Sequence, residues 1–377
     1  MNYEFEFKMA DELPEINILP PLLINKDGEK ITTADEWLKN KDYLKSMLKY
    51  YMYGDIPDNS IDFNVTGEIL FSEEVFHNQA IHEFVKIGFG VNKNNKDRLS
   101  FVAEITRPVN SNKTNKCRVI TYIAFSNARN YEVETEAVIK KGYAIALFNY
   151  EQLVPDNPDI NVADLPISKM FGNDMELKAI GMWAFCNMRL IDYLDSAGYA
   201  LKDEYITTGH SRNGKAALCA GIFDERVKIT VPNNSGCGGG CFRLLGGKNG
   251  LTQNADKTES LQTLTAAFPH WFSKNMNQFY DIPGKTYSQG QTLNNKLPFD
   301  LHFNKALIAP RVLLSLEAYG DEWANPYGSK LTHDAAKEIY DLLGVSENIS
   351  IKFREGGHEF GTQDWLSLLD FCDRFSD

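Results

Sequence analysis

One serine in this chain has neighbours that suit nucleophilic catalysis. It lies in residues 209–215, which read GHSRNGK. Residues 205–208 before this run are typical of a short β-strand, and residues 215–220 after it are typical of a helix. A serine at such a turn stands clear of the backbone, and free N–H groups at the helix start favour a negative intermediate beside it. The spacing predicts that Ser211 is the nucleophile of an elbow, although Asn213 stands where the usual G-x-S-x-G motif has its last glycine.

A serine nucleophile needs a base, and the chain has seven histidines. His358 follows Gly356 and Gly357 directly after a predicted strand at 349–353. It therefore lies in a loop at the C-terminal edge of the predicted sheet, where α/β-hydrolases keep their base. His210 belongs to the elbow itself, and we expect its side chain to point away from the serine hydroxyl. His358 is the predicted base.

The base needs an acid to orient it, and the loop after a predicted strand at 311–317 offers candidates. They are Glu317, Asp321 and Glu322. The chain order Ser…Asp…His is the order of the α/β-hydrolases, which favours Asp321. An aspartate beside a glycine is equally suited to building a turn. Glu317 and Glu322 stay open as alternatives.

From residue 118 onwards, short apolar segments alternate with amphipathic ones. We predict strands at 119–125, 143–149, 205–208, 227–231, 311–317 and 349–353, and helices at 134–141, 178–196, 331–343 and 364–375. This alternation predicts an α/β fold, an α/β-hydrolase-like three-layer sandwich whose central sheet is mostly parallel with helices on both faces. Functional groups are then expected in loops at the C-terminal ends of the strands.

The rest of the chain departs from this alternation. Residues 1–60 are predicted to form an N-terminal arm and a helix, which a capping box of Thr33 and Glu36 opens. Residues 62–108 alternate apolar and polar side chains, which indicates antiparallel strands at a sheet edge. Residues 236–300 interrupt the pattern and are predicted to form a substrate-binding insertion. We expect residues 1–377 to form a single domain.

Composition and charge exclude several partners. A net charge of −12 without a basic cluster argues against nucleic acid, whose phosphates would be repelled. No stretch approaches the roughly 20 apolar residues that span a bilayer, so no membrane partner is expected. The six cysteines are too sparse for a disulfide framework, and no second pair supports a metal site at Cys237 and Cys241. We expect free thiols, no metal and no cofactor.

The residues at the start of the chain lack the charged and then apolar layout of a signal peptide. We therefore expect a cytoplasmic protein, or a secreted one if an export signal has been removed. We also expect a monomer.

Several runs together resemble the glucuronoyl esterases, a family of α/β-hydrolases and carbohydrate esterases that act in lignocellulose degradation. These enzymes cleave esters between the glucuronic acid side chains of xylan and lignin alcohols. The matching runs are 209–215, 234–239, 268–272, 297–302 with 306–311, 321–326, and 356–358 with Asp364 and Trp365. The resemblance extends from about residue 118 to the end of the chain.

The resemblance implies roles for further residues. The backbone N–H and guanidinium of Arg212 would stabilise the oxyanion, with a second N–H from the loop around 126–128. Lys215, Glu259 and Trp323 would bind the uronate sugar. Each of the three has a structural alternative: a solvated helix charge for Lys215, a surface carboxylate for Glu259 and a core aromatic for Trp323.

One position departs from the fungal members, many of which place their catalytic glutamate where this chain has Asn234. An asparagine can orient a histidine but adds no charge to stabilise imidazolium. Some bacterial members use the later loop, where Asp321 lies. Either Asp321 is the acid or the enzyme is weakened, and in both cases Asn234 is expected near the same histidine.

The sequence thus predicts a serine esterase that cleaves glucuronoyl esters through an acyl-enzyme. Its expected partner is a glucuronic acid ester or a xylan-derived oligosaccharide. One alternative is a carbohydrate esterase that acts on another ester, such as acetyl or methyl. The other is a catalytically idle homologue that binds carbohydrate.

Overall fold

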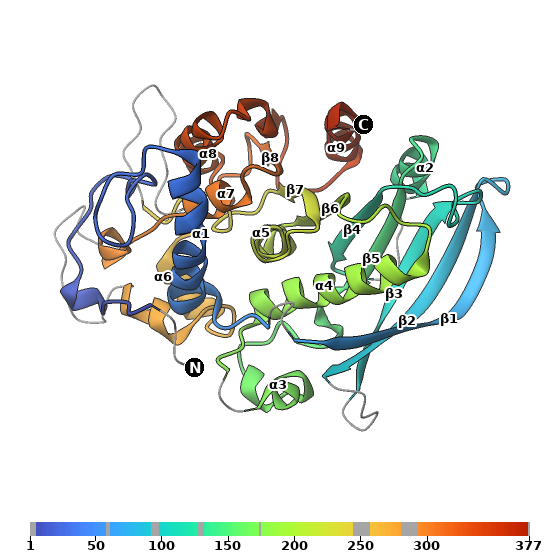
Figure 1. Ribbon diagram of the computed structural model, residues 1–377, viewed down its shortest axis with the longest axis horizontal. Helices are drawn as coiled ribbons and strands as arrows, with labels where there is room; N and C mark the ends of the chain where they lie inside the picture. Colours follow the sequence, from blue (N-terminus) through green and yellow to red (C-terminus); the bar gives the residue numbers. More distant parts are fainter. Residues whose placement is uncertain are drawn as a thin grey trace.

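The computed structural model describes residues 5–57, 61–91, 98–126, 132–172, 175–243, 257–279 and 293–375. Within these residues, one nine-stranded sheet has the order β1-β2-β3-β5-β4-β6-β7-β8-β9 (Figure 1). The strands are β1 (Phe63–Val75), β2 (Ala80–Val91), β3 (Leu99–Pro108), β4 (Val119–Ala124), β5 (Ala144–Asn149), β6 (Tyr205–His210), β7 (Val227–Asn233), β8 (Val312–Ala318) and β9 (Ile349–Arg354). Strands β4 to β9 pair with one another in parallel. Strands β1, β2 and β3 pair antiparallel with one another, and β3 also pairs antiparallel with β5.

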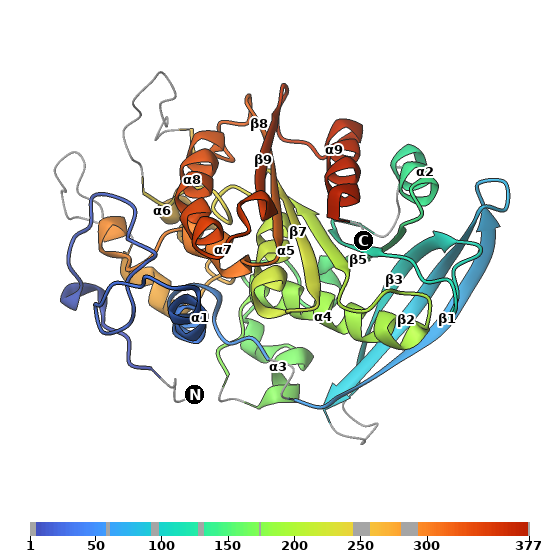
Figure 2. The ribbon, with the colours of Figure 1, turned by 45° about the horizontal axis from the view of Figure 1, so that its top comes forward.

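Helices cover both faces of the sheet. They are α1 (Ala34–Leu48), α2 (Glu132–Lys140), α3 (Pro166–Phe171), α4 (Ala179–Ala197), α5 (Arg212–Phe223), α6 (Leu261–Ala267), α7 (His302–Ile308), α8 (Pro326–Leu342) and α9 (Thr362–Cys372). Helices α2 and α9 lie on one side of the sheet, and α4 and α5 lie on the other (Figure 2). The predicted α/β class, with its mostly parallel sheet between helices, is confirmed.

Two apolar cores result from the alternation of side chains along the central strands. In β4, Ile120 and Tyr122 pack with Trp365 of α9, whereas Val119 and Ile123 belong to the core on the other face, with α4 and α5. All six residues of β4 are buried. Parallel strands that are covered on both faces read as continuous apolar runs, which is why the sequence revealed them clearly.

Residues 62–108, whose alternation predicted antiparallel strands at a sheet edge, form three such strands at one edge of the sheet. Strands β1 to β3 form an antiparallel meander that projects at one end of the molecule (Figure 1). The N-terminal arm and α6 lie at the opposite end. The predicted capping box is present at the start of α1, where the Thr33 side chain accepts from the Glu36 N–H.

Most elements differ from their predicted bounds by a few residues, and the largest shift is at the start of α8. Helix α8 begins at Pro326, five residues before the predicted start at 331, because the fixed φ of proline suits a first helical position and Asn325 caps the Gly328 N–H. Strand β6 runs on to His210, two residues beyond its predicted end.

The predicted N-terminal arm is bound to the rest of the molecule by buried side chains. Arg243 donates to the Ile16 carbonyl at 3.1 Å, and His302 Nε2 contacts the Pro20 carbonyl at 2.7 Å. Arg243 is itself paired with Asp300 at 3.1 Å, and neither side chain is exposed. The arm is therefore part of the folded structure from at least Ile16 to Pro20.

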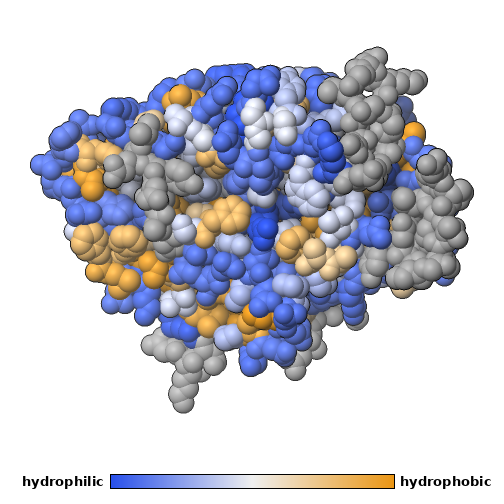
Figure 3. All heavy atoms as spheres, turned by 180° about the vertical axis from the view of Figure 1, so that it is seen from behind, coloured by the Kyte–Doolittle hydropathy of each residue, from blue (hydrophilic) through white to orange (hydrophobic). Residues whose placement is uncertain are grey.

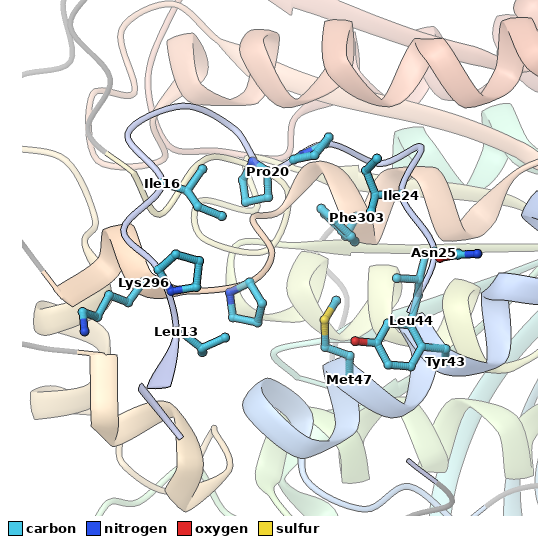
Figure 4. Close-up of a pocket in the computed structure, with 13 residues that line it drawn as sticks. Leu13, Ile16, Pro20, Ile24, Asn25, Tyr43, Leu44, Met47, Lys296 and Phe303 are labelled. Carbon is cyan, nitrogen blue, oxygen red and sulfur yellow. The ribbon is translucent and has the colours of Figure 1, made fainter. Parts of the chain in front are cut away.

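A cavity of about 250 Å³ lies between this arm and α1 (Figure 4). Its walls include Leu13 and Pro20 from the arm, Leu44 and Met47 from α1, and Phe303 from α7. None of its lining residues belongs to the predicted catalytic site.

The coloured surface in Figure 3 is mainly hydrophilic, with apolar residues in separate small patches. Across the described ranges, none of the helices has the length and apolar character needed to cross a bilayer.

Candidate active site

Ser211 occupies a strained turn between β6 and α5. Its backbone has φ 58° and ψ −124°, a conformation that residues other than glycine rarely adopt. The Ser211 N–H donates to the Asn233 carbonyl at 2.9 Å, and its hydroxyl does not cap α5. The hydroxyl is therefore free for chemistry, as the predicted elbow requires.

Close packing explains the glycines of the elbow. A Cβ added to Gly209 would lie 2.3 Å from the carbonyl oxygen of Asn213. A Cβ added to Gly214 would lie 3.0 Å from the Gly209 carbonyl oxygen and 3.0 Å from the Ser235 Cβ. The start of α5 thus approaches the ends of β6 and β7 closely at Gly214, one position after the usual glycine of the motif.

The predicted base and the favoured acid are hydrogen-bonded partners. His358 Nδ1 donates to Asp321 Oδ2 at 2.6 Å. Asp321 follows β8 and is buried, whereas His358 follows β9 and 38% of its side chain is exposed. Both side chains are described, as is Ser211, and no hydrogen bond joins His358 to Ser211 Oγ. Such catalytic contacts are often long before substrate binds.

Besides His358, Asn234 and a backbone amide favour the charged form of Asp321. Asn234 Nδ2 donates to Asp321 Oδ2 at 2.6 Å, and the Ala324 N–H donates to Oδ1 at 3.2 Å. Burial alone would raise the pKa of Asp321, but the hydrogen bond and charge of His358, with these two donors, lower it below its ordinary value. The expected position of Asn234, near the predicted base, is what the structure shows.

The alternative acids lie elsewhere. Glu317 is fully buried and accepts from the Ser329 hydroxyl, and burial raises its pKa to about 7. Glu322 is exposed and pairs with Lys257 at 3.0 Å. The geometry therefore favours Asp321 over both.

His210, which we expected to point away from the serine hydroxyl, borders the predicted base. Its ring centroid lies 4.5 Å from that of His358, and its Nδ1 donates to Asn233 Oδ1 at 2.6 Å. Burial and the nearby His358 lower the pKa of His210 to about 4, which keeps it neutral near pH 7. Its position beside the serine in the sequence was the only available signal.

Arg212 is held by a carboxylate that sequence reasoning missed. Its Nη1 contacts Asp156 Oδ2, and its guanidinium lies 5.2 Å from the ring centroids of Phe268 and Trp271. Asp156 also accepts from His270 at 2.8 Å and from Trp271 at 2.7 Å.

Asp156 is strongly acidic as a result. Burial would raise its pKa, but hydrogen bonds from His270, Trp271 and Arg212 lower it to about 2. Nothing in its local sequence signals this role, because Arg212, His270 and Trp271 lie 56, 114 and 115 residues away.

Lys215 and Glu259 form a buried ion pair. Lys215 Nζ lies 2.9 Å from Glu259 Oε2, with 2% and 5% of the side chains exposed. The Cys237 N–H donates to the same oxygen at 2.6 Å, and Lys215 Nζ lies 5.7 Å from the Trp271 ring centroid. The structural alternatives of a solvated lysine and a surface glutamate are therefore wrong.

Trp323 lies beside this pair with 43% of its surface exposed. Its carbonyl accepts from the Glu259 N–H at 3.0 Å. Trp323 is therefore not a core aromatic, and its indole is available to a ligand.

The predicted oxyanion donors are only partly described. Arg212 is the first residue of α5, so its N–H has no partner within the helix. The second donor was expected around 126–128, of which Asn127 and Ala128 lie outside the described residues. In the described ranges, no group of three or more His, Cys, Asp or Glu side chains is arranged to hold a metal ion.

Comparison with known proteins places this arrangement in a family. A family model described as "Glucuronyl esterase, fungi" matches residues 91–344. The chain belongs to the glucuronyl esterase family. The resemblance inferred from the sequence runs is thereby confirmed, and with it the class of carboxylic ester hydrolases.

The matches between this member of the glucuronyl esterase family and its curated relatives cover most of both chains. "Carbohydrate esterase MZ0003", from an unknown prokaryotic organism, is 28% identical over 411 residues, covering 94% of this chain and 89% of the relative. A 4-O-methyl-glucuronoyl methylesterase of Phanerochaete carnosa is 26% identical over 372 residues, covering 97% of this chain and 81% of the relative.

A solved structure agrees with the fold. It is a carbohydrate esterase family 15 glucuronoyl esterase from Caldicellulosiruptor kristjansonii, with a TM-score of 0.75 and 26% sequence identity. The match covers 97% of this chain and 93% of that chain.

Proposed function

We propose that this protein hydrolyses glucuronoyl esters, with Ser211, His358 and Asp321 as its catalytic triad. The observation that carries the proposal is the hydrogen bond from His358 Nδ1 to the buried Asp321, beside a serine in an elbow conformation. The names of the relatives, glucuronoyl methylesterase and glucuronoyl esterase, support the substrate class.

The proposed reaction has two halves. Ser211 Oγ attacks the C6 carbonyl of the uronate ester while His358 Nε2 accepts its proton. Asp321 holds the Nδ1–H and stabilises the imidazolium that forms. His358 then protonates the departing alcohol, and an acyl-enzyme remains. Water, activated by His358, attacks this ester and releases the glucuronic acid and Ser211.

The negative charge that develops on the carbonyl oxygen is stabilised at the start of α5. The Arg212 N–H points out of the first helical turn, and its guanidinium is kept near the elbow by Asp156. Each oxyanion donor of this kind contributes roughly 10²- to 10³-fold in rate.

The uronate sugar binds at the buried pair of Lys215 and Glu259, with the exposed indole of Trp323 against its ring. The ammonium and carboxylate supply hydrogen bonds to sugar hydroxyls. A plain acetate ester offers no such hydroxyls, which gives the site a reason to prefer uronates.

The test uses the purified Ser211→Ala variant with benzyl glucuronate. We expect no turnover by the variant, and labelling of the wild-type protein but not the variant by a fluorophosphonate probe. Retained turnover would overturn the mechanism. A higher kcat/KM for an acetylated sugar than for benzyl glucuronate would instead favour a carbohydrate esterase of different specificity. A wild-type protein that neither labels nor turns over would be an idle homologue.

A further inference from the structure

One arginine donates hydrogen bonds to the backbone on both sides of the predicted base. Arg354 is the last residue of β9, and only 7% of its surface is exposed. Its Nη2 donates to the Gly357 carbonyl at 3.2 Å and to the Glu359 carbonyl at 2.7 Å. These carbonyls belong to the residues on either side of His358. A single guanidinium nitrogen therefore sets the position of the peptide that bears the base.

The guanidinium is itself anchored to α9. Its Nε lies 2.9 and 2.8 Å from the two oxygens of Asp364, which is buried in the first turn of the helix. Its Nη1 donates to the Glu355 carbonyl at 3.0 Å and to Glu359 Oε1 at 3.1 Å. The loop between β9 and α9 thus closes around one buried cation.

The same loop is linked to the acid. The Gly357 carbonyl also accepts from Asn234 Nδ2 at 3.4 Å, the amide that donates to Asp321. The Gly320 N–H, next to Asp321, donates to the Gly356 carbonyl at 3.0 Å. The loops that carry the acid and the base are therefore held as one unit.

We propose that Arg354 is a positioning residue that sets the orientation of His358 between Asp321 and Ser211. The loop needs such a restraint because it contains Gly356 and Gly357, and Gly356 has φ +102°. Glycines lose more conformational freedom on ordering than other residues do. The planar fork of arginine can reach two carbonyls and a carboxylate at once, whereas the ammonium of a lysine cannot. The proposal rests on the triad proposed above.

The test compares Arg354→Lys with a matched control, Arg118→Lys. Arg118 is also 7% exposed and also binds a carboxylate and two carbonyls, namely those of Glu204, Cys372 and Phe375. It precedes β4, so it lies at the opposite edge of the parallel sheet from Ser211. Both variants keep the positive charge and lose the planar guanidinium. Any loss of activity that comes only from lower stability should therefore occur in both.

We expect Arg354→Lys to lower kcat about 100-fold, as a displacement near 1 Å does, with little change in KM. Arg118→Lys should lower the thermal midpoint by a similar amount and leave kcat unchanged. Activities are measured with benzyl glucuronate and with an aryl acetate, together with the rate of fluorophosphonate labelling. A wild-type kcat in Arg354→Lys, or an equal loss in both variants, would overturn the positioning role.

The readouts separate this inference from the proposed function. If wild-type protein cleaves the aryl acetate and labels with the probe but leaves benzyl glucuronate intact, the substrate proposal fails while the comparison of arginines still stands. If Arg354→Lys does not fold, Asp364→Asn replaces it, since it removes the negative charge that anchors Arg354 Nε without removing the cation. A wild-type labelling rate in Asp364→Asn would then overturn the role of the anchored guanidinium.

Discussion

Charged side chains at the site lie against partners that offset them. Asp321 receives hydrogen bonds from His358 and Asn234, and Lys215 is paired with Glu259 at 2.9 Å. A buried charge without a partner is costly, so each pair constrains what a substitution can do. Predictions for single residues must therefore consider the partner that remains.

The charge behind the base can be tested with Asp321→Asn. We expect kcat to fall by about 10⁴, with little change in KM, because imidazolium forms only during the chemical step. Adding Asn234→Glu should restore part of the rate, since the Asn234 side chain already reaches both Asp321 and the Gly357 carbonyl beside His358. Steady-state kinetics of the single and double variants decide. A wild-type kcat for Asp321→Asn would refute the acid assignment.

The single variant Asn234→Glu is informative as its control. It places a second carboxylate where an amide now donates to Asp321, and two adjacent carboxylates keep one proton to a higher pH. On acidification, the two carboxylates therefore take up their first proton at a higher pH than Asp321 does in the wild-type protein. The acidic limb of its kcat/KM profile should therefore move to higher pH than in the wild-type protein.

Because Lys215 is paired with the buried Glu259, a substitution of Lys215 affects stability as well as substrate binding. Lys215→Ala leaves Glu259 buried and unpaired, so we expect the free energy of unfolding to fall by about 3–5 kcal/mol. Lys215→Met with Glu259→Gln removes both charges and should recover most of that loss. The double variant should raise KM for a uronate ester more than for an aryl acetate. Equal changes for the two substrates would mean that the pair supports the elbow and not the sugar.

At the scale of elements, the site collects the ends of neighbouring parallel strands. Ser211 follows β6, Asn234 follows β7, Asp321 follows β8 and His358 follows β9. Asp156, which holds Arg212, lies beyond β5. Because parallel strands end at one edge of the sheet, these residues converge although they are far apart in the sequence.

The elbow stores strain that a glycine would relieve. Ser211→Gly and Ser211→Ala both remove the proposed nucleophile, but only glycine adopts φ 58° and ψ −124° without cost. The strain is worth about 1–3 kcal/mol, and glycine loses about 0.5–1 kcal/mol through its greater freedom when unfolded. Ser211→Gly should thus be more stable than Ser211→Ala by about 1 kcal/mol. A Ser211→Gly variant that unfolds at lower urea than Ser211→Ala, by about the 0.5–1 kcal/mol that glycine costs, would show that the turn is unstrained.

At the scale of the whole molecule, burial keeps several histidines neutral. Burial lowers the pKa to about 4 for His210 and His302, and to about 3 for His333. The unfolded chain binds these protons nearer pH 6.5, so acidification favours unfolding from about pH 6.5 down to these values. Glu317, whose pKa burial raises to about 7, acts in the opposite direction.

A variant isolates the histidine contribution from the opposing one. Between pH 6.5 and 4, His333→Gln should gain stability relative to the wild-type protein as the pH falls, by up to about 1.4 kcal/mol per pH unit. His77→Gln, which replaces an exposed histidine, is the control. Urea unfolding at a series of pH values measures the difference. A constant difference between wild type and His333→Gln would contradict the proton linkage.

The sequence by itself determined the elements and the chemical class. Apolar runs, the capping box at Thr33 and the run around Ser211 are local patterns, and local patterns reflect backbone geometry directly. The sequence predicted His358 as the base from its place after a strand. It confined the candidate acids to one loop, the one that contains Asp321. Helix α8 was misplaced at its start because the proline that begins it was not recognised as a first helical residue.

Only the tertiary structure decided between the carboxylates and revealed the supporting residues. Glu317, Asp321 and Glu322 lie within six residues of each other, and which of them meets His358 depends on how two loops pack. Asp156 and Arg354 carried no signal in their local sequence. The role of Asp156 comes from hydrogen bonds to residues that are distant in the sequence, and that of Arg354 from the way the loop after β9 folds around its side chain. Neither set of contacts exists before the chain has folded.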